Sequence, residues 1–363
     1  MFFTESSYRM KRYDWIDVLK GIGILLVVGG HILLDNSFVK RSIYVFHMPL
    51  FFFIAGYLFN PSNIKEYFNK KFVHLLVPYL IFLSFFNIPS LIRIILKSNS
   101  MLNDLMQILK PMLIGGQALV DWTGVFWFPT CLFFTQMLVN ILMVKYAPRT
   151  VLVVILGVMF FSYLRSYFFP HFWLALNMNV ALAAAPYFYA GYWFKSHQIN
   201  LNLKTVVCST LFCLFIIVTL YLDIPTLHHV TQNFKAGDYG LPYYSFVSAI
   251  AFIVFLVWAA QVLDRFSLIS KPLKSLGEMS MVIMYLHQPI QLSLKSLNNA
   301  NHAYSISSPF SRFIITIILS VVAYFFISKL TFARVFLLGS YSDFVRVFAS
   351  KISKPVDQKS SLI

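Results

Sequence analysis

The chain has 363 residues, of which 59% are hydrophobic and only 12% are charged, and its mean hydropathy is +0.73. Soluble domains are about one quarter charged, so this composition excludes a soluble globular protein and predicts an integral membrane protein. The net charge is +16, but no soluble module carries a basic face interleaved with stacking aromatic residues, so we expect no nucleic-acid partner.

Long apolar segments predict the fold class. A transmembrane helix needs about 20 mainly apolar residues, whereas a membrane β-barrel would show short alternating segments, which this sequence lacks. We therefore predict an all-α integral membrane protein with about ten transmembrane helices, and a short interfacial or re-entrant helix over residues 101–116. The predicted spans cover residues 14–34, 42–59, 72–96, 121–144, 150–169, 179–195, 204–222, 241–263, 277–295 and 311–331.

The positions of the basic residues predict the orientation. With the N-terminus in the cytoplasm, nineteen of the 29 Lys and Arg residues fall on the cytoplasmic side, as the positive-inside rule requires. Both termini are therefore expected to be cytoplasmic, with one transmembrane domain over residues 1–335 and a cytoplasmic C-terminal tail over residues 336–363. The first apolar segment is too long for a signal peptide, so we expect it to remain as an anchor.

The first predicted span, residues 14–34, carries ionisable side chains on one face. Lys20 and His31 are eleven residues apart, which is about three helical turns and roughly 16 Å of rise, so they share a face. Asp17 lies one turn before Lys20 and can pair with its ammonium group. Two ionisable residues on one face of a span favour a lined cavity, because each would cost about 2.5–3.5 kcal/mol in lipid. The alternative is that Asp17 and Lys20 reach the cytoplasmic headgroups and His31 lies at the outer interface.

The second and third spans add two groups of candidate residues. His47 is expected at the same depth as His31, where two imidazoles could share a proton or bind a metal, although a lone interfacial histidine is also common. Lys70, Lys71 and His74 gather where the third span begins. They either form a phosphate-binding cluster or are present only because of the positive-inside rule.

Later segments contribute fewer signals. Trp127 in the fourth span is either part of a site or an interfacial aromatic residue. Tyr285 and His287 lie in the ninth span, where a histidine followed by Gln and Pro is unusual. The three cysteines lie inside apolar segments without C-x-x-C spacing, so we expect no disulfide framework and no metal site.

Four stretches of sequence resemble one family. They read R-x-D-W-I-D-V-L-K-G-I-G-I-L-L-V-V-x-G-H from residue 12, F-H-M-P-L-F-F-F-I-A-G-Y-L-F from residue 46, F-W-F from residue 126 and Y-L-H-Q-P from residue 285. Together they resemble the acyltransferase-3 family of integral membrane O-acyltransferases, and the first is closest to the fucose 4-O-acetylase-like branch. The family signature of a basic residue, ten intervening residues and a histidine corresponds here to Lys20 and His31.

The resemblance implies an activity, a location and roles for residues. Family members transfer an acyl group, usually acetyl from cytoplasmic acetyl-CoA, to a sugar hydroxyl of an envelope or secreted glycan. It implies that His31 is the catalytic imidazole, supported by Lys20, and that Lys71 and His74 stand where the family often has two arginines. A neutral imidazole at position 74 would bind phosphate more weakly than a guanidinium group.

By the same resemblance the protein would lie in the bacterial inner membrane and would modify a polysaccharide. Acetyl-CoA would be its donor substrate, a glycan or lipid-linked saccharide its acceptor, and no cofactor would be permanently bound. The rival hypotheses are a transporter or flippase of a lipid-linked sugar or glycan and a non-enzymatic assembly subunit. Transporters usually show paired broken spans and internal symmetry, which the sequence lacks. The sequence does not indicate the sugar, the hydroxyl or the oligomeric state.

Overall fold

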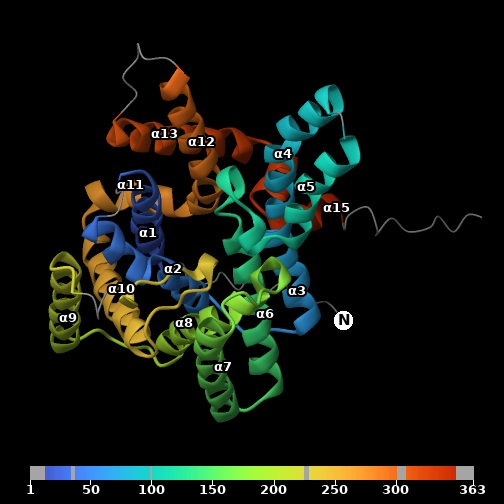
Figure 1. Cartoon of the computed structure of the whole chain (residues 1–363). Helices are drawn as coiled ribbons and strands as arrows, with labels where there is room; N and C mark the ends of the chain where they lie inside the picture. Colours follow the sequence, from blue (N-terminus) through green and yellow to red (C-terminus); the bar gives the residue numbers. More distant parts are fainter. Residues whose placement is uncertain (1–12, 34–36, 99, 225–228, 301–307, 349–363) are drawn as a thin grey trace, which may run out of the picture.

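The structure is a computed structural model that describes residues 13–33, 37–98, 100–224, 229–300 and 308–348. These residues fold into helices, and their one extended pairing is an isolated bridge between Asn233 and Asp238. The all-α prediction is therefore confirmed (Figure 1). The longer helices are α1 (Asp14–Ile32), α2 (Phe38–Tyr57), α4 (Val77–Lys97), α5 (Met101–Ile114), α6 (Trp127–Lys145), α7 (Pro148–Phe168), α8 (Met178–Ser196), α9 (Leu203–Tyr221), α10 (Tyr244–Leu263), α11 (Ser267–Glu278), α12 (Ser280–Ala300) and α13 (Pro309–Lys329). Shorter helices are α3 (Ile64–Lys71), η1 (Phe72–Leu76), η6 (Phe234–Ala236), α14 (Thr331–Leu337) and α15 (Tyr341–Phe348).

Eight helical segments in the described part of the chain are long and apolar enough to cross a membrane. This number supports a multi-pass membrane protein. Helices α8 and α12 lie at the predicted sixth and ninth spans and have 19 and 21 residues, but they are less apolar than the other eight. The prediction of about ten spans is thus supported for eight of them, and the cytoplasmic position of both termini stays a prediction.

Several short elements modify the predicted chain path. The segment at residues 101–116 is largely helical, as α5, and no residue of α5 is buried. The predicted ninth span begins three residues later than expected, at Ser280, because α11 ends at Glu278 immediately before it. Part of the predicted C-terminal tail is folded as α15, while residues 349–363 of that tail lie outside the described residues.

The two C-terminal helices are fixed by an ion pair. The Arg334 Nε atom of α14 donates to the Asp343 carboxylate of α15 at 2.7 Å, and Ser340 donates to the same oxygen at 2.8 Å. These hydrogen bonds lower the pKa of Asp343 to about 2. Helix α14 packs on α4 and α15 packs on η1, so the C-terminal segment lies against the beginning of the third predicted span.

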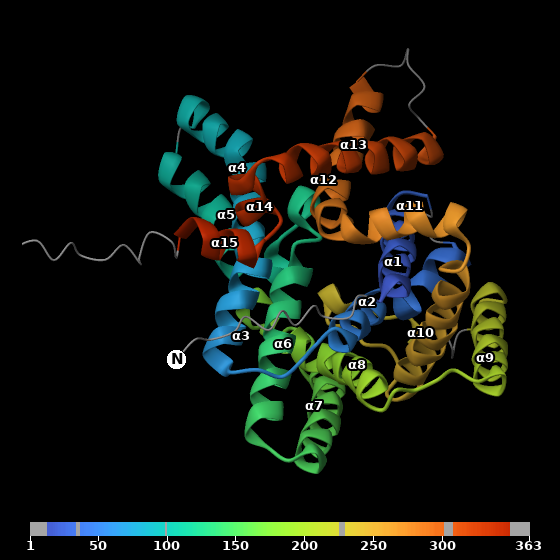
Figure 2. The same cartoon turned by 180° about the vertical axis from the view of Figure 1, so that it is seen from behind.

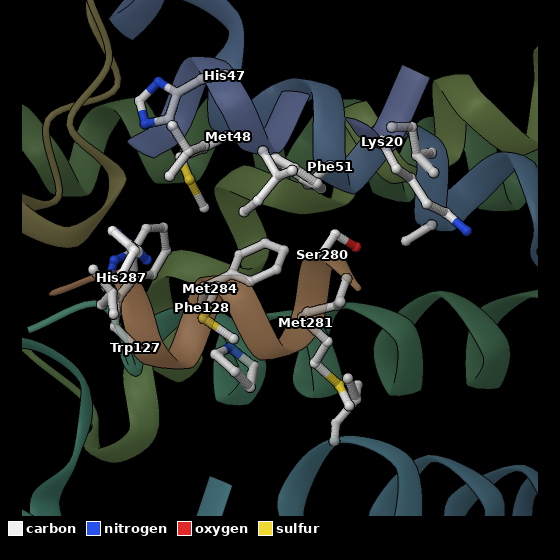
Figure 3. A pocket seen from close by; sticks show the side chains of 18 of the residues that line it. Lys20, His47, Met48, Phe51, Trp127, Phe128, Ser280, Met281, Met284 and His287 are labelled. Carbon is white, nitrogen blue, oxygen red and sulfur yellow. The ribbon is translucent and has the colours of Figure 1, made fainter. Parts of the chain in front are cut away.

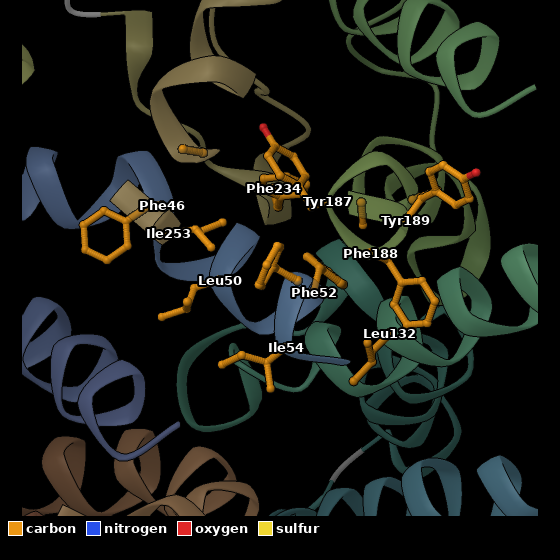
Figure 4. Packing of buried hydrophobic residues seen from close by; sticks show 14 of the residues in the cluster. Phe46, Leu50, Phe52, Ile54, Leu132, Tyr187, Phe188, Tyr189, Phe234 and Ile253 are labelled. Carbon is orange, nitrogen blue, oxygen red and sulfur yellow. The ribbon is translucent and has the colours of Figure 1, made fainter. Parts of the chain in front are cut away.

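Helices α9 and α5 lie on opposite sides of the molecule in both views (Figures 1 and 2). Helix α2 lies inside the bundle and contacts α1, α8, α9 and α10. Its Phe46 ring stacks on Phe252 of α10 with 4.8 Å between the centroids. Phe52 is also buried, together with Phe188 of α8 (Figure 4). The main hydrophobic core is therefore organised around α2.

Glycines allow the helices of this core to approach closely. A Cβ atom added to Gly191 of α8 would overlap the Phe53 carbonyl oxygen of α2, and one added to Gly21 of α1 would overlap the Leu273 carbonyl oxygen of α11. Small residues at such crossings are typical of membrane helix packing, because they let backbones come into contact. Gly21 therefore lets α1 and α11 meet backbone to backbone.

A glycine substitution at one crossing tests this packing. Gly191→Ala forces α2 and α8 apart, and overpacking of this kind costs roughly 1–3 kcal/mol. We expect a lower midpoint of thermal unfolding in detergent. Gly157→Ala in α7 is the matched control, because no atom lies within 4 Å of the added Cβ. Equal midpoints for the two variants would contradict the close crossing.

Candidate active site

A cavity of about 840 Å³ lies between α1, α2, η1, α6 and α12. It brings together residues from widely separated predicted spans, as a binding site in a helical bundle requires. Eight of the ten candidate site residues line it, namely Asp17, Lys20, His31, His47, Lys71, His74, Trp127 and His287. The other two, Lys70 and Tyr285, are not among its lining residues.

The polar face of α1 forms one wall of the cavity. Lys20 and His31 both line it, as their eleven-residue spacing predicts. The Lys20 Nζ atom donates to the Asp17 carboxylate at 3.1 Å, and both side chains are largely shielded, with exposed fractions of 25% and 12%. Asp17, Lys20 and His31 of α1 therefore face a cavity within the protein.

Three imidazoles gather at one end of this cavity. The His31 and His287 ring centroids are 5.4 Å apart, and the Tyr44 ring lies 4.6 Å from His47 and 6.5 Å from His31. Figure 3 shows His47 and His287 at one end of the cavity and Lys20 at the other. The cavity thus has an imidazole end and a cationic end.

Backbone contacts fix the tautomers of two of these imidazoles. The Nδ1 atom of His47 lies 3.1 Å from the Ile43 carbonyl, and that of His287 lies 3.0 Å from the Ile283 carbonyl. Since a carbonyl only accepts, each Nδ1 carries the proton and each neutral ring keeps Nε2 as an acceptor. The buried Nε2 of His287 has no hydrogen-bond partner in the described part of the chain. His287 therefore keeps one unused hydrogen-bond acceptor beside the cavity.

The cationic end is built by Lys20, Lys71 and His74. Lys71 is half-buried, with Nζ 5.3 Å from the centroid of the Tyr67 ring. His74 lies in η1, a π-helical turn of the kind often found at functional sites, and its Nδ1 donates to the Gly339 carbonyl at 3.2 Å. Lys70 is exposed, so only one of the two adjacent lysines reaches the cavity.

Tyr285 lies in an aromatic cluster instead. Its ring stacks on Phe82 at 4.5 Å and meets Phe126 edge to face at 4.9 Å. The residue is fully buried, and its hydroxyl has no hydrogen-bond partner within the described residues. Helical geometry explains this position, because Tyr285 and His287 are two residues apart and so face different sides of α12.

The structure adds lining residues that the sequence analysis did not select. These are Tyr44, Asp121, Gln136, Gln232, Lys235 and Glu278, among others. Tyr44 could have been inferred, because it lies one turn before His47 on the same face. Gln232 and Lys235 had no such signal, because both come from the loop between α9 and α10 and their positions depend on tertiary contacts.

Lys235 joins two loops at the cavity. Its Nζ atom donates to the Leu119 carbonyl at 2.6 Å. Burial lowers the pKa of Lys235 by disfavouring the ammonium form, and the nearby Asp121 carboxylate offsets part of that effect. Lys235 therefore adds a cationic side chain to the lining, from a segment that is distant in sequence from Lys20 and Lys71.

No group of three or more His, Cys, Asp or Glu residues within the described ranges is arranged to hold a metal ion. The absence of a metal site stays a prediction. What the cavity does offer is a set of imidazole acceptors at one end and a pair of lysines with a histidine at the other. Such an arrangement suits proton transfer near a bound anionic ligand.

Comparisons with known proteins identify the family of the chain. The acyltransferase domain family matches residues 13–329. The chain belongs to this acyltransferase-3 family, and the eight candidate spans among its described residues make it a multi-pass membrane protein. It is also 40% identical over 78 residues to nodulation protein NolL of Sinorhizobium fredii, a match that spans 18% of this chain and 21% of that protein. No solved structure matches the chain.

The position of Tyr285 generates a prediction. Tyr285→Phe removes a buried hydroxyl that has no hydrogen-bond partner among the described residues, and such a group costs roughly 1–3 kcal/mol. We expect a raised midpoint of thermal unfolding and unchanged acyl transfer, measured on membranes with equal amounts of the two proteins. Loss of activity in the variant would instead support an acceptor-side role for the hydroxyl.

Proposed function

We propose that this protein transfers an acetyl group from cytoplasmic acetyl-CoA to a sugar hydroxyl of a cell-envelope or exported glycan, with His31 as the catalytic imidazole. The single observation that supports this most is the cavity, which is lined by Lys20 and His31 from one face of α1. The family assignment supports acyl transfer. The acetyl group, the glycan acceptor, the fucose 4-O-acetylase-like branch and the bacterial inner membrane are parts of the proposal.

The proposed chemistry needs one base of near-neutral pKa. The sugar hydroxyl oxygen bonds to the thioester carbonyl carbon, the carbon–sulfur bond breaks, and the hydroxyl proton passes to His31. The CoA thiolate leaves and recovers that proton. A histidine performs this exchange because its unperturbed pKa lies near neutrality. An acyl-histidine intermediate would use the same imidazole as nucleophile.

The cationic end fits the donor. Acetyl-CoA carries phosphate groups, and lysine side chains bind phosphates as point charges. Lys71 and Lys20 line this end, and the Asp17 carboxylate holds the Lys20 ammonium at 3.1 Å. His74 lies beside them, with Nδ1 committed to the Gly339 carbonyl. By the positive-inside prediction this end faces the cytoplasm, where acetyl-CoA is found.

The imidazole end fits a hydroxylated acceptor. Nε2 of His287 can accept from a sugar hydroxyl, and its ring lies 5.4 Å from that of His31. His47 and Tyr44 add polar atoms beside them, while Trp127 offers an apolar ring of the kind that covers sugar faces. We assign these residues to the acceptor side, with a finished glycan or a lipid-linked saccharide as the substrate.

The first experiment removes the proposed base. His31→Ala should slow glycan O-acetylation by roughly 10²–10⁴-fold, the contribution typical of a general base, and so lower the O-acetyl content of surface glycan. Cells expressing either protein at equal membrane levels would be compared by ester analysis of isolated glycan. His197→Ala is the matched control, because His197 is exposed at the end of α8.

Each outcome of this experiment decides between hypotheses. Loss of acetyl esters with glycan still at the surface supports catalysis at His31. Unchanged acetylation excludes His31 as the base. Disappearance of the glycan itself from the surface would favour the transporter or flippase hypothesis.

Adjacent lysines test the donor site. Lys71→Ala should weaken acetyl-CoA binding roughly tenfold to hundredfold, because a hydrogen bond to a charged group contributes about 1.5–3 kcal/mol. Lys70→Ala should leave the affinity unchanged, since Lys70 is exposed and does not line the cavity. Isothermal titration calorimetry on the purified proteins measures both dissociation constants. Equal weakening by the two substitutions would show that general surface charge accounts for the binding.

A further inference from the structure

The loop over residues 229–241, which we call the 229–241 loop, is firmly packed against the bundle. The buried Phe234 ring lies 5.8 Å from Phe52 of α2 and 6.0 Å from Tyr187 of α8 (Figure 4). On its other side, the Gly237 carbonyl accepts from Arg165 and Ser166 of α7 at 3.1 and 2.8 Å. The loop is therefore held at several points.

Gln232 of this loop is 1% exposed and uses its whole amide. Its Nε2 atom donates to the Val45 carbonyl of α2 at 3.0 Å and to the Ser245 carbonyl of α10 at 3.1 Å. Its Oε1 atom accepts from the Tyr187 hydroxyl of α8 at 2.8 Å. In addition, its backbone N–H donates to the Tyr44 carbonyl at 3.0 Å. One side chain thus joins three helices.

Pro49 explains why α2 needs this partner. In a regular helix the carbonyl of Val45 accepts from the N–H four residues later, but residue 49 is a proline and has no N–H. A buried carbonyl without a partner is costly, particularly within a membrane. Gln232 supplies the missing donor, so the side chain of a distant loop replaces one backbone hydrogen bond of α2.

The residues beside this replaced bond belong to the imidazole end of the cavity. His47 lies two residues before Pro49, and the Tyr44 ring is 4.6 Å from the His47 ring and 6.5 Å from that of His31. Gln232 itself also lines the cavity. The hydrogen bonds of Gln232 therefore set the direction of α2 at the point where it presents Tyr44 and His47.

We infer that Gln232 is a positioning residue for acyl transfer, which holds the proline-interrupted part of α2 so that His47 and Tyr44 face His31. The inference rests on the proposed function. Gln232 acts through its two donated hydrogen bonds to Val45 and Ser245. It has no part in donor binding, because the cationic end of the cavity is formed by other elements.

The test compares two buried amides. Gln232→Met keeps the size of the side chain and removes both donors. The matched control is Asn140→Leu, because Asn140 of α6 is also a buried amide that binds a loop, with two 3.0 Å hydrogen bonds to the Ser62 backbone. Membrane vesicles with equal amounts of each protein receive radiolabelled acetyl-CoA, and label transferred to glycan is measured. Acetyl-CoA affinity is measured by calorimetry on the purified proteins.

Gln232→Met should slow transfer roughly tenfold to hundredfold, the effect of a small misplacement of reacting groups, with acetyl-CoA affinity unchanged. Asn140→Leu should change neither quantity per folded protein. Tyr187→Phe, which leaves both donated bonds of Gln232 in place, should transfer at nearly the wild-type rate. Equal effects of Gln232→Met and Asn140→Leu would overturn the inference.

A rescue experiment addresses the mechanism itself. Pro49→Ala restores an N–H that can donate to Val45, so Gln232→Met should slow transfer less in the Pro49→Ala background than in the wild type. An undiminished loss in that background would overturn the inference. Gln232→Glu provides a second variant should Gln232→Met fail to accumulate, since the carboxylate keeps the shape and the Tyr187 bond. A wild-type rate for Gln232→Glu would also overturn it.

Hydrogen exchange separates this inference from the proposed function. Backbone amides over residues 43–50 should exchange faster in Gln232→Met than in the wild type, whatever reaction the protein performs. If wild-type vesicles transfer no label, the proposed function fails while the exchange result still tests the positioning of α2. Unchanged exchange together with unchanged transfer would reject the role of Gln232.

Discussion

The cost of placing ionisable groups inside an apolar bundle governs this structure. Asp17, Lys20 and His31 lie on a helix that is long and apolar enough to cross a membrane. They are accommodated because their shared face borders an internal cavity and because Asp17 and Lys20 form an ion pair. The other helices are arranged to enclose that face, and polar side chains from several of them, including α2, α6, α11 and α12, complete the lining.

Close helix crossings make the enclosure possible. Gly21 lets α1 meet α11 backbone to backbone, and Gly191 does the same for α8 and α2. Larger side chains at these crossings would hold the helices further apart. Lipid is as apolar as leucine and gives no strong force for association, so the helices depend on close packing. The crossings fix α2 in the core, and the Pro49 interruption in α2 is then compensated by Gln232. Packing and chemistry are therefore linked through one helix.

The two ends of the cavity differ in how their groups are held. At the imidazole end, His47 and His287 are oriented by carbonyls of their own helices, one turn earlier. At the cationic end, His74 is oriented by Gly339, which comes from the C-terminal segment. The imidazole end is thus locally determined once its helices are in place, whereas the cationic end also depends on α14 and α15.

Much of the architecture could be predicted from local patterns. Apolar length gave the helices within a few residues, because each helix satisfies its own backbone hydrogen bonds in lipid. Helices α11, α14 and α15 were not expected, since they are short and less apolar, and packing against other elements stabilises them.

For the site, the sequence by itself determined that Lys20 and His31 share a face and that Asp17 pairs with Lys20, because these relations depend only on helical geometry. Only the tertiary structure decided that His287 approaches His31, that Lys71 rather than Lys70 reaches the cavity, and that Tyr285 packs among aromatic rings. It also decided that Gln232 and Lys235 line the cavity at all. The physical reason is that these relations depend on the rotation and crossing of whole helices, and on loop contacts between residues far apart in the chain.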